Sequence, residues 1–307
     1  MDKIMPISWW VSQTINKQDG KRRNENGEII HFLRETSLKN ESINWYVNLS
    51  LITNLNIYNN KLTKLPESIG NLSLMTNLDI SLNRLTKLPE SIINLSLLIQ
   101  LNIAHNKMIE LPELIGNLAL LTYLNVNQNE LTFLPESIGK MSSLTILYIY
   151  NNKITKLPES IGNLSLLIEL YINNNKFTKL PEAIGNLKSL EILYINNNEL
   201  TILPKSIGNL FLLKVLMINN NKLTILPESI INLSLLKTLR VSTNKLTHLP
   251  EFIGNLSSLK CLHIENNCLI DMPLSIKQLS QLTTIYIDNY MLSYLSFNIR
   301  KIAYGVG

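Results

Sequence analysis

Residues 144–166 read LTILYIYNNKITKLPESIGNLSL, and this text recurs at a constant spacing through most of the 307-residue chain. Ten of the 11 prolines mark the recurrence, because each follows the previous one by 23 residues. They are Pro66, Pro89, Pro112, Pro135, Pro158, Pro181, Pro204, Pro227, Pro250 and Pro273. A fixed period of this length indicates stacked units that share one continuous core rather than independent domains.

Composition narrows the class of protein further. Hydrophobic residues make up 45% of the chain and charged residues 17%, which excludes a wholly disordered chain. Two cysteines exclude a disulfide-based fold, and a net charge of +5 is too small to favour nucleic acid or a membrane as partner. The start, MDKIMPISWW, lacks the apolar core of a signal peptide, and no apolar run is long enough to span a membrane. We therefore expect a cytoplasmic protein.

The first half of each repeat predicts a short strand. We number the repeat from its first leucine, so that Leu144, Leu147 and Ile149 occupy positions 1, 4 and 6. These apolar residues alternate with β-formers such as Tyr148 and Tyr150. One such strand cannot bury its apolar face alone, but stacked copies form a parallel sheet with strands about 4.8 Å apart.

Position 9 is an asparagine in all ten full repeats, at the point where the chain turns inward after the strand. An amide there can satisfy both N–H and C=O groups of a buried turn, so we predict a stacked, structural asparagine ladder. Its members are Asn60, Asn83, Asn106, Asn129, Asn152, Asn175, Asn198, Asn221, Asn244 and Asn267.

The second half of each repeat predicts a short return segment. The proline at position 15 suits the first position of a short helix or 3-10 turn. At position 19, seven repeats carry a glycine, for which we expect a positive φ. These are Gly70, Gly116, Gly139, Gly162, Gly185, Gly208 and Gly254.

Together these positions resemble the leucine-rich repeat signature LxxLxLxxNxL, in the 23-residue LPxxIGxL form found in intracellular Ras-group repeat proteins. Similar arrays occur in amoebae, intracellular bacteria and large amoeba-infecting viruses, so the cytoplasm in question is the host's if the source is such a bacterium or virus. The resemblance implies an α/β solenoid. This is a curved right-handed coil with a parallel β-sheet on its concave face and short helix or 3-10 turns on its convex face.

The repeat also predicts the domain organisation. Residues 1–51 form a non-repeating segment and cap, residues 52–281 hold ten repeats, and residues 282–307 form a degenerate repeat and closing cap. In the last unit Tyr290 replaces the ladder asparagine and Ser296 replaces the proline. A cap is expected at each end because a solenoid otherwise exposes an open core and an unpaired strand edge.

No motif for catalysis, phosphate binding or a cofactor stands out from the repeat, so we expect no enzymatic activity and no cofactor. One group was weighed as a zinc site: Cys261, His263 and Glu265 alternate along one strand, with Cys268 and Asp288 nearby. Arg240 takes the place of His263 one repeat earlier, and the spacing matches no standard zinc motif. We interpret these as ordinary surface residues and predict no metal site.

The candidate function lies at positions 3, 5 and 7, which face outward from the strands. In the middle of the array these positions form an aromatic and aliphatic patch that we predict to bind a partner, because exposed Tyr and Met clusters mark interaction surfaces. Its residues are Tyr123, Ile146, Tyr148, Tyr150, Tyr171, Ile192, Tyr194, Val215 and Met217. The other interpretation is that the tyrosines simply suit strand positions and stack along the sheet.

The sequence therefore predicts a monomeric, non-enzymatic interaction scaffold that holds a protein or peptide on its concave face. The alternative is an effector or substrate receptor that recruits a partner to an enzyme complex through residues 1–50. Rows of lysine at positions 10 and 13 and of glutamate at position 16 predict a solvated rim.

Overall fold

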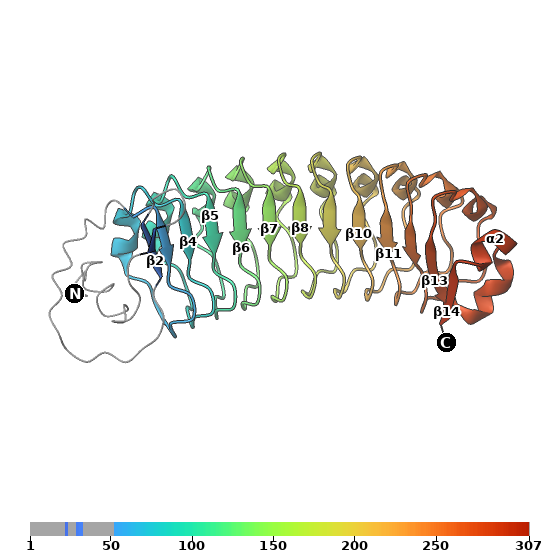
Figure 1. Ribbon diagram of the computed structural model, residues 1–307, viewed down its shortest axis with the longest axis horizontal. Coiled ribbons are helices and arrows are strands. Elements are labelled where there is room, and N and C mark those ends of the chain that lie inside the picture. Colours follow the sequence, from blue (N-terminus) through green and yellow to red (C-terminus); the bar gives the residue numbers. More distant parts are fainter. Residues whose placement is uncertain (1–21, 24–28, 33–51, 307) are drawn as a thin grey trace. The chain divides into compact units, whose positions relative to one another are not determined.

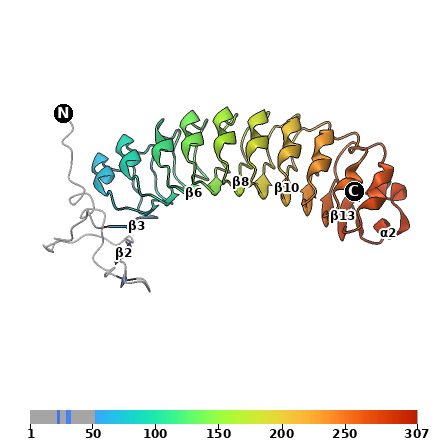
Figure 2. The same ribbon diagram turned by 90° about the horizontal axis from the view of Figure 1, so that it is seen from above.

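The computed structural model describes residues 22–23, 29–32 and 52–306, and the chain divides into two compact units, Met1–Tyr148 and Ile149–Gly307. We call them unit 1 and unit 2. Both are built in the same way, from one short strand and one 3-10 helix per repeat (Figure 1). In each unit the strands lie on one side and the 3-10 helices on the other (Figure 2).

Each repeat contributes one strand, and neighbouring strands within a unit pair in parallel and in register. For example, Val215, Leu216 and Met217 lie opposite Thr238, Leu239 and Arg240. Unit 1 holds β1 (Arg22–Arg23), β2 (Ile29–Phe32), β3 (Asn54–Asn56), β4 (Asn77–Asp79), β5 (Gln100–Asn102), β6 (Tyr123–Asn125) and β7 (Ile146–Tyr148). Unit 2 holds β8 (Glu169–Tyr171), β9 (Ile192–Tyr194), β10 (Val215–Met217), β11 (Thr238–Arg240), β12 (Cys261–His263), β13 (Thr284–Asp288) and β14 (Ala303–Val306). Apart from β1, which runs antiparallel to β2, the pairings confirm the predicted parallel arrangement.

The return segments are 3-10 helices, as the PESI sequence predicts. Unit 1 contains η2 (Glu67–Asn71), η3 (Glu90–Asn94), η4 (Ile115–Asn117) and η5 (Glu136–Lys140). Unit 2 contains η6 (Glu159–Asn163), η7 (Glu182–Asn186), η8 (Lys205–Asn209), η9 (Glu228–Asn232), η10 (Ile253–Asn255), η11 (Leu274–Gln278), η12 (Asn289–Tyr294) and one α-helix, α2 (Phe297–Arg300).

The proline precedes the 3-10 helix instead of opening it. Pro66 has extended backbone angles and its carbonyl oxygen accepts a hydrogen bond from the Ile69 N–H at 3.0 Å. The prediction that proline is the first helical residue is therefore wrong, by one position in most repeats and by three before Ile115–Asn117 and Ile253–Asn255. Its missing N–H is still harmless there, because that group would not belong to the helix ladder.

The core is a column of leucine and isoleucine repeated once per strand. Leu147 in unit 1 and Ile149 in unit 2 are fully buried, as are the corresponding residues of the neighbouring repeats. Leu164, after the 3-10 helix, closes the core from the opposite side. Burying such side chains stabilises the fold by roughly 1.5–3 kcal/mol each, and this column is what holds the short strands in place.

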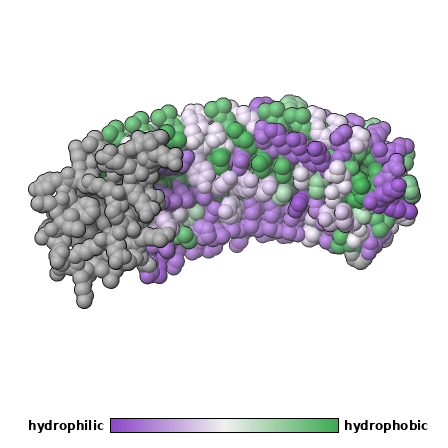
Figure 3. Space-filling view, in the orientation of Figure 1, coloured by the Kyte–Doolittle hydropathy of each residue, from purple (hydrophilic) through white to green (hydrophobic). Residues whose placement is uncertain are grey.

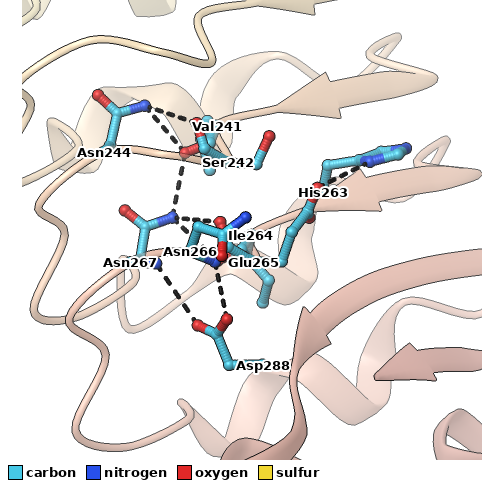
Figure 4. A network of polar contacts seen from close by, with 9 residues as sticks. All are labelled: Val241, Ser242, Asn244, His263, Ile264, Glu265, Asn266, Asn267 and Asp288. Atoms are coloured by element: carbon cyan, nitrogen blue, oxygen red, sulfur yellow. Dashed lines mark hydrogen bonds and ion pairs between the residues drawn. The ribbon is translucent and has the colours of Figure 1, made fainter. Parts of the chain in front are cut away.

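The asparagine ladder is confirmed (Figure 4). The Asn244 amide donates hydrogen bonds to the carbonyl oxygens of Val241 at 2.9 Å, Ser242 at 3.2 Å and Ile218 of the preceding repeat at 3.0 Å. Its Oδ1 accepts one from the Leu223 N–H at 3.0 Å. Each rung therefore joins two consecutive repeats through buried polar groups that water cannot reach.

The glycines at position 19 serve a different purpose from the one expected. None of the six glycines Gly70, Gly116, Gly162, Gly185, Gly208 and Gly254 has a positive φ. A Cβ on Gly208 would instead collide with the backbone oxygen of Ser229 in the next 3-10 helix. The expectation of a positive φ is wrong, because glycine is needed there for close approach between helices.

The positive φ occurs at position 8, directly after the strand. Asn174, Asn197 and Asn220 have φ between 54° and 55°. Asparagine tolerates this left-handed region better than most residues, which explains why it recurs there. Other repeats place Leu82, His105, Gln128 or Thr243 in the same conformation.

The degenerate repeat at residues 282–307 differs from a full repeat in its strand and in the residue at position 9. β13 is longer than the other strands and pairs in parallel with β14. The Tyr290 hydroxyl donates to the carbonyl oxygen of Leu269 at 3.0 Å. At the other end, the expectation of a cap at residues 1–51 concerns residues that mostly lie outside those described.

Candidate binding surface

The sheet face of unit 2 is the outward surface formed by positions 3, 5 and 7 of its repeats. It exists because residues alternate along each strand: Leu193 is fully buried, whereas its neighbours Ile192 and Tyr194 are only half-buried. In β10 the same alternation buries Leu216 and turns the side chains on either side outward. No described element covers this face.

Five of the predicted patch residues lie side by side here. Tyr171 pairs with Tyr194, and Tyr194 in turn pairs with Met217 on the next strand. The other two, at position 3, pair with each other across β9 and β10. The residues, which we call the Tyr–Met patch, are Tyr171, Ile192, Tyr194, Val215 and Met217. The prediction that they are contiguous is confirmed within unit 2.

Two tyrosines of the patch pack directly against each other. The Tyr171 and Tyr194 rings have centroids 4.4 Å apart and are tilted by 49°. Burial raises the pKa of Tyr171 to about 12, and the nearby Glu169 charge and a hydrogen bond with the Tyr194 hydroxyl act in the same direction. The hydroxyl therefore stays protonated, and remains a hydrogen-bond donor, at all physiological pH values.

The remaining four predicted residues are described separately. Tyr123, Ile146 and Tyr148 lie in unit 1, where the Tyr123 and Tyr148 rings pack edge to face with centroids 5.7 Å apart. Tyr150 belongs to unit 2 but lies beyond the strands. The nine residues are thus divided between two units, three in unit 1 and six in unit 2.

All nine predicted residues are half-buried rather than freely exposed. Part of their surface is used in packing along the sheet, as the ring pairs show, which agrees with the interpretation that the tyrosines stack along the strands. A half-buried aromatic row on an uncovered face is still a rigid apolar platform, because its rings are already fixed by their neighbours.

Position 5 continues from the patch into a charged stretch of the same face. Met217 pairs with Arg240 and Arg240 pairs with His263, whose ring stacks on Tyr286 at 4.3 Å. The Tyr286 ring stacks in turn on Tyr304 at 4.9 Å. A line of flat or planar side chains therefore runs across β11 to β14.

The environment of His263 keeps it neutral. Its Nδ1 lies 3.5 Å from Oε1 of Glu265, and the two side chains are only 13% and 14% exposed. Burial holds the pKa of His263 below its ordinary value, and the Arg240 charge acts in the same direction against the Glu265 carboxylate. Burial also raises the pKa of the Cys261 thiol.

The candidate zinc ligands around His263 do not form a metal site in the part of the chain that the structure describes. No group of three or more His, Cys, Asp or Glu side chains there is placed to hold a metal ion. Asp288 is occupied by backbone N–H groups of the preceding turn (Figure 4).

A second ladder of amides borders the Tyr–Met patch, and the sequence interpretation missed it. Asn197 Nδ2 donates to Asn174 Oδ1 at 2.6 Å, and Asn220 Nδ2 donates to Asn197 Oδ1 at 2.6 Å. The recurring text INNN was its signal, but only the third asparagine was recognised. This exposed ladder fixes the turn that ends each strand beside the patch.

A groove on another face of unit 2 was also missed. It has a volume of about 730 Å³ and is lined by Ile202, Pro204, Ile225 and Pro227 among others. Ile202 and Ile225 are 55% and 57% exposed at position 13, where Lys156 and Lys179 stand in earlier repeats. The replacement of lysine by isoleucine in two consecutive repeats was a readable signal.

The face in Figure 3 is a mosaic, with apolar atoms gathered mainly in its upper half and hydrophilic atoms along much of its lower part. Two lysines are paired with glutamates of the preceding repeat, Lys214 with Glu191 at 2.7 Å and Lys222 with Glu199 at 2.8 Å. Such exposed pairs contribute little to stability but keep the surface polar.

Comparison with known proteins places the chain in a family. A family model described as a leucine-rich repeat region matches residues 29–126, 113–203 and 196–297. The chain therefore belongs to the leucine-rich repeat family, and its fold is that of a leucine-rich repeat solenoid. A search of the curated proteins finds no significant match.

Several solved structures are similar to this chain. The plant peptide hormone receptor RGFR1 in complex with RGF2 is 28% identical with a TM-score of 0.72, over 89% of this chain and 46% of the receptor. An internalin, InlF, of Listeria monocytogenes is 25% identical with a TM-score of 0.62, over 78% of this chain and 75% of the internalin. PEPR1 with AtPEP1 is 25% identical with a TM-score of 0.64, over 87% of this chain and 40% of that one. This chain thus spans less than half the length of the RGFR1 chain and of the PEPR1 chain.

In the described part of the chain, no helix has both the length and the apolar character needed to cross a membrane. The helices described are short 3-10 turns and the four-residue α2.

Proposed function

We propose that the protein is a non-enzymatic binding module that holds a protein or peptide segment on the sheet face of unit 2, which is the concave face of the solenoid. The observation that carries this proposal is the Tyr–Met patch, in which aromatic and aliphatic side chains from three consecutive strands lie in register. Aromatic residues and methionine are enriched in the cores of protein interfaces.

Two further features support a peptide-like occupant. The patch is bordered by polar side chains, since the amide ladder of Asn174, Asn197 and Asn220 runs along one edge. A central apolar area with a polar rim is the usual anatomy of an interface. In addition, the similar proteins RGFR1 and PEPR1 were solved with RGF2 and AtPEP1, respectively.

The proposal can be tested by selection from a displayed library of random dodecapeptides on the full chain. Enriched peptides should lose affinity by about 10-fold or more for the variant Tyr194→Ala with Met217→Ala, since buried interface aromatics commonly contribute over 1 kcal/mol. The matched control is Phe211→Ala with Ile225→Ala, which removes exposed apolar side chains away from the sheet face.

Peptides that bind the patch variant and the wild type equally, but fail to bind the control variant, would assign binding to the groove around Ile225 and overturn the proposal. Thermal unfolding of each variant verifies that the fold is intact. Because Tyr194 and Met217 are half-buried, both variants should remain folded.

We also propose a cytoplasmic location. The two cysteines, Cys261 and Cys268, are not bridged, which fits a reducing compartment. Titration with a thiol reagent under denaturing, non-reducing conditions should find both thiols free in protein isolated from its natural source. A blocked pair would contradict this location.

A further inference from the structure

We infer that the segment bound on unit 2 is acidic: a carboxylate of the partner binds Arg240 while apolar side chains of the same segment cover Tyr194 and Met217. This inference rests on the proposed function and specifies the chemistry of the partner. It follows from the position, partners and surroundings of Arg240.

Arg240 is an unpaired cation on the sheet face. It lies at position 5 of β11, directly beside Met217 of the Tyr–Met patch and beside His263 on the other side. Its guanidinium forms no ion pair and no side-chain hydrogen bond with any described residue, and its Nε is buried without a partner. A buried donor without an acceptor is costly, and a carboxylate is the group that a guanidinium binds best.

The surroundings of Arg240 are predominantly basic. Lys237 and Lys260, at position 2 of neighbouring repeats, are exposed and form no ion pair among the described residues. Lys214, the third lysine at this position, is already paired with Glu191. Among the described residues, the uncompensated charges around Arg240 are therefore its own guanidinium, these two lysines and the carboxylate of Glu265.

These charges complement an acidic segment rather than a basic one. Position 2 lies three residues before position 5, which places the two lysines within about 10–15 Å of the guanidinium. At that range they attract an approaching acidic peptide without competing for the carboxylate at Arg240.

Two buried acceptors favour a peptide over a simple anion. Asn173 Oδ1 and Glu265 Oε2 have no hydrogen-bond partner in the described structure, and both belong to position 7. They lie four repeats apart, or about 19 Å, which an extended segment of about six residues spans. The N–H groups of such a segment can satisfy these oxygens at its two ends, one in the repeat of Tyr171 and the other two repeats beyond Met217.

His263 helps to fix the site. Its stacking on Tyr286 and its contact with Glu265 hold the imidazole beside Arg240. Since burial keeps it neutral, it does not add a competing positive charge. The carboxylate is therefore directed to the guanidinium.

The test uses the dodecapeptide library on the full chain, followed by pairs of synthetic peptides. We expect the enriched peptides to carry an Asp or Glu next to apolar residues. Replacing that acid by its amide should weaken binding to the wild type by about 10- to 100-fold, as expected for a charged hydrogen bond. The variant Arg240→Gln should bind the acid peptide and its amide twin equally.

Two further variants sharpen the test. Glu265→Gln removes the one opposing charge and should strengthen binding of the acid peptide but not of its amide twin. Lys205→Gln, on the exposed side of η8, is the matched control and should leave both affinities unchanged. Heat denaturation confirms that each variant is folded.

The two proposals fail in different ways. Peptides that depend on the Tyr–Met patch but show no preference for acid, or keep that preference in Arg240→Gln, overturn the acidic-segment inference alone. Peptides that bind elsewhere on the chain overturn the proposed function as well. Equal binding of any polyanion, for example heparin, with loss of the apolar requirement would show a general anion site and likewise overturn the inference.

Discussion

Oδ1 of Asp288 accepts a hydrogen bond from the backbone N–H of Asn266 at 2.8 Å, whereas the equivalent N–H one repeat earlier, that of Thr243, donates to the backbone carbonyl oxygen of Glu265 (Figure 4). Oδ2 of the same carboxylate accepts from the Asn267 N–H at 3.4 Å. A carboxylate suffices here because it only has to accept, as the backbone carbonyl oxygens of a further repeat would do. Asp288 thus closes the last full repeat.

We predict that Asp288→Ala destabilises the C-terminal repeats by about 1–3 kcal/mol, because two N–H groups of a half-buried turn lose their acceptor. Hydrogen exchange should show faster exchange of the Asn266 and Asn267 amides. Asp288→Asn keeps an acceptor oxygen and should cost less. If the alanine variant exchanges at the wild-type rate, Asp288 does not close the last full repeat.

Replacing an internal asparagine of the ladder should lower the free energy of unfolding more than replacing an exposed asparagine. Asn221 donates to the carbonyl oxygens of Ile195 and Ile218 at 3.1 Å and accepts from the Leu200 N–H at 3.0 Å. Asn221→Ala leaves these groups unpaired, and we expect a loss of about 3 kcal/mol or more in the free energy of unfolding. Urea denaturation measures it.

The control for this variant is Asn232→Ala, which removes an exposed amide at the end of η9. It should change stability by less than about 0.5 kcal/mol. Equal losses in the two variants would mean that the ladder is not the stabilising feature.

The backbone of one residue is strained, and a substitution there should raise the stability of the fold. Thr243 is β-branched but has φ of 52°, where the preceding repeats have asparagine. Thr243→Asn should raise stability by about 1 kcal/mol, because the left-handed conformation costs most residues 1–2 kcal/mol and asparagine less. Thr201→Asn, at an exposed position without a positive φ, is the control and should have no effect. A gain at Thr201 equal to that at Thr243 would contradict the explanation.

Where the 3-10 helices pack closely, a substitution should lower stability instead of raising it. Gly208→Ala places a methyl group against the backbone oxygen of Ser229, and we expect a loss of about 1–3 kcal/mol from overpacking. Asn209→Ala, the next residue in η8, is exposed and should be neutral in the same thermal unfolding experiment. Tolerance of the alanine would show that the helices can separate at little cost.

The same packing explains the two isoleucines at position 19. Ile93 and Ile231 are followed, one repeat later, by Leu114 and Phe252 at position 17, where the serine otherwise recurs. In those following repeats the 3-10 helices η4 and η10 have only three residues. A changed helix path therefore accompanies the larger side chain.

The sequence predicted those features that depend on one repeat and its copies. The burial of Leu147 and the hydrogen bonding of Asn244 follow from periodicity, because every copy must satisfy the same neighbours. The role of Gly208 could not be read in this way, since glycine suits both a positive φ and a close approach, and only the position of Ser229 distinguishes them. The structural role of Asp288 was not predicted, because the end of the full repeats occurs once and has no period.

The binding surface was predicted in part for a similar reason. Periodicity placed Tyr171, Tyr194 and Met217 side by side, but it says nothing about how far each ring is buried by its neighbours. The unpaired state of Arg240 depends on where Glu265 and His263 direct their side chains, and the repeat positions alone do not contain that information.

The raised pKa of Tyr171 can be measured by alkaline titration. The Tyr171 hydroxyl has a pKa raised to about 12, from an ordinary value of 10.0, chiefly by burial. The difference in tyrosinate absorbance between the wild type and Tyr171→Phe should therefore show a midpoint near pH 12 in the native protein. In denaturant the same difference should have its midpoint near pH 10, because the unfolded chain exposes the hydroxyl.

The sign of the linked stability change follows from these two values. The native state holds the proton more tightly than the unfolded state, so this contribution to stability is complete below pH 10 and declines as pH rises from 10 toward 12. Tyr171→Phe should lose stability less steeply than the wild type over that interval. A native midpoint near pH 10 would show that the ring is solvated, and the Tyr–Met patch would then be a looser surface than its packing indicates.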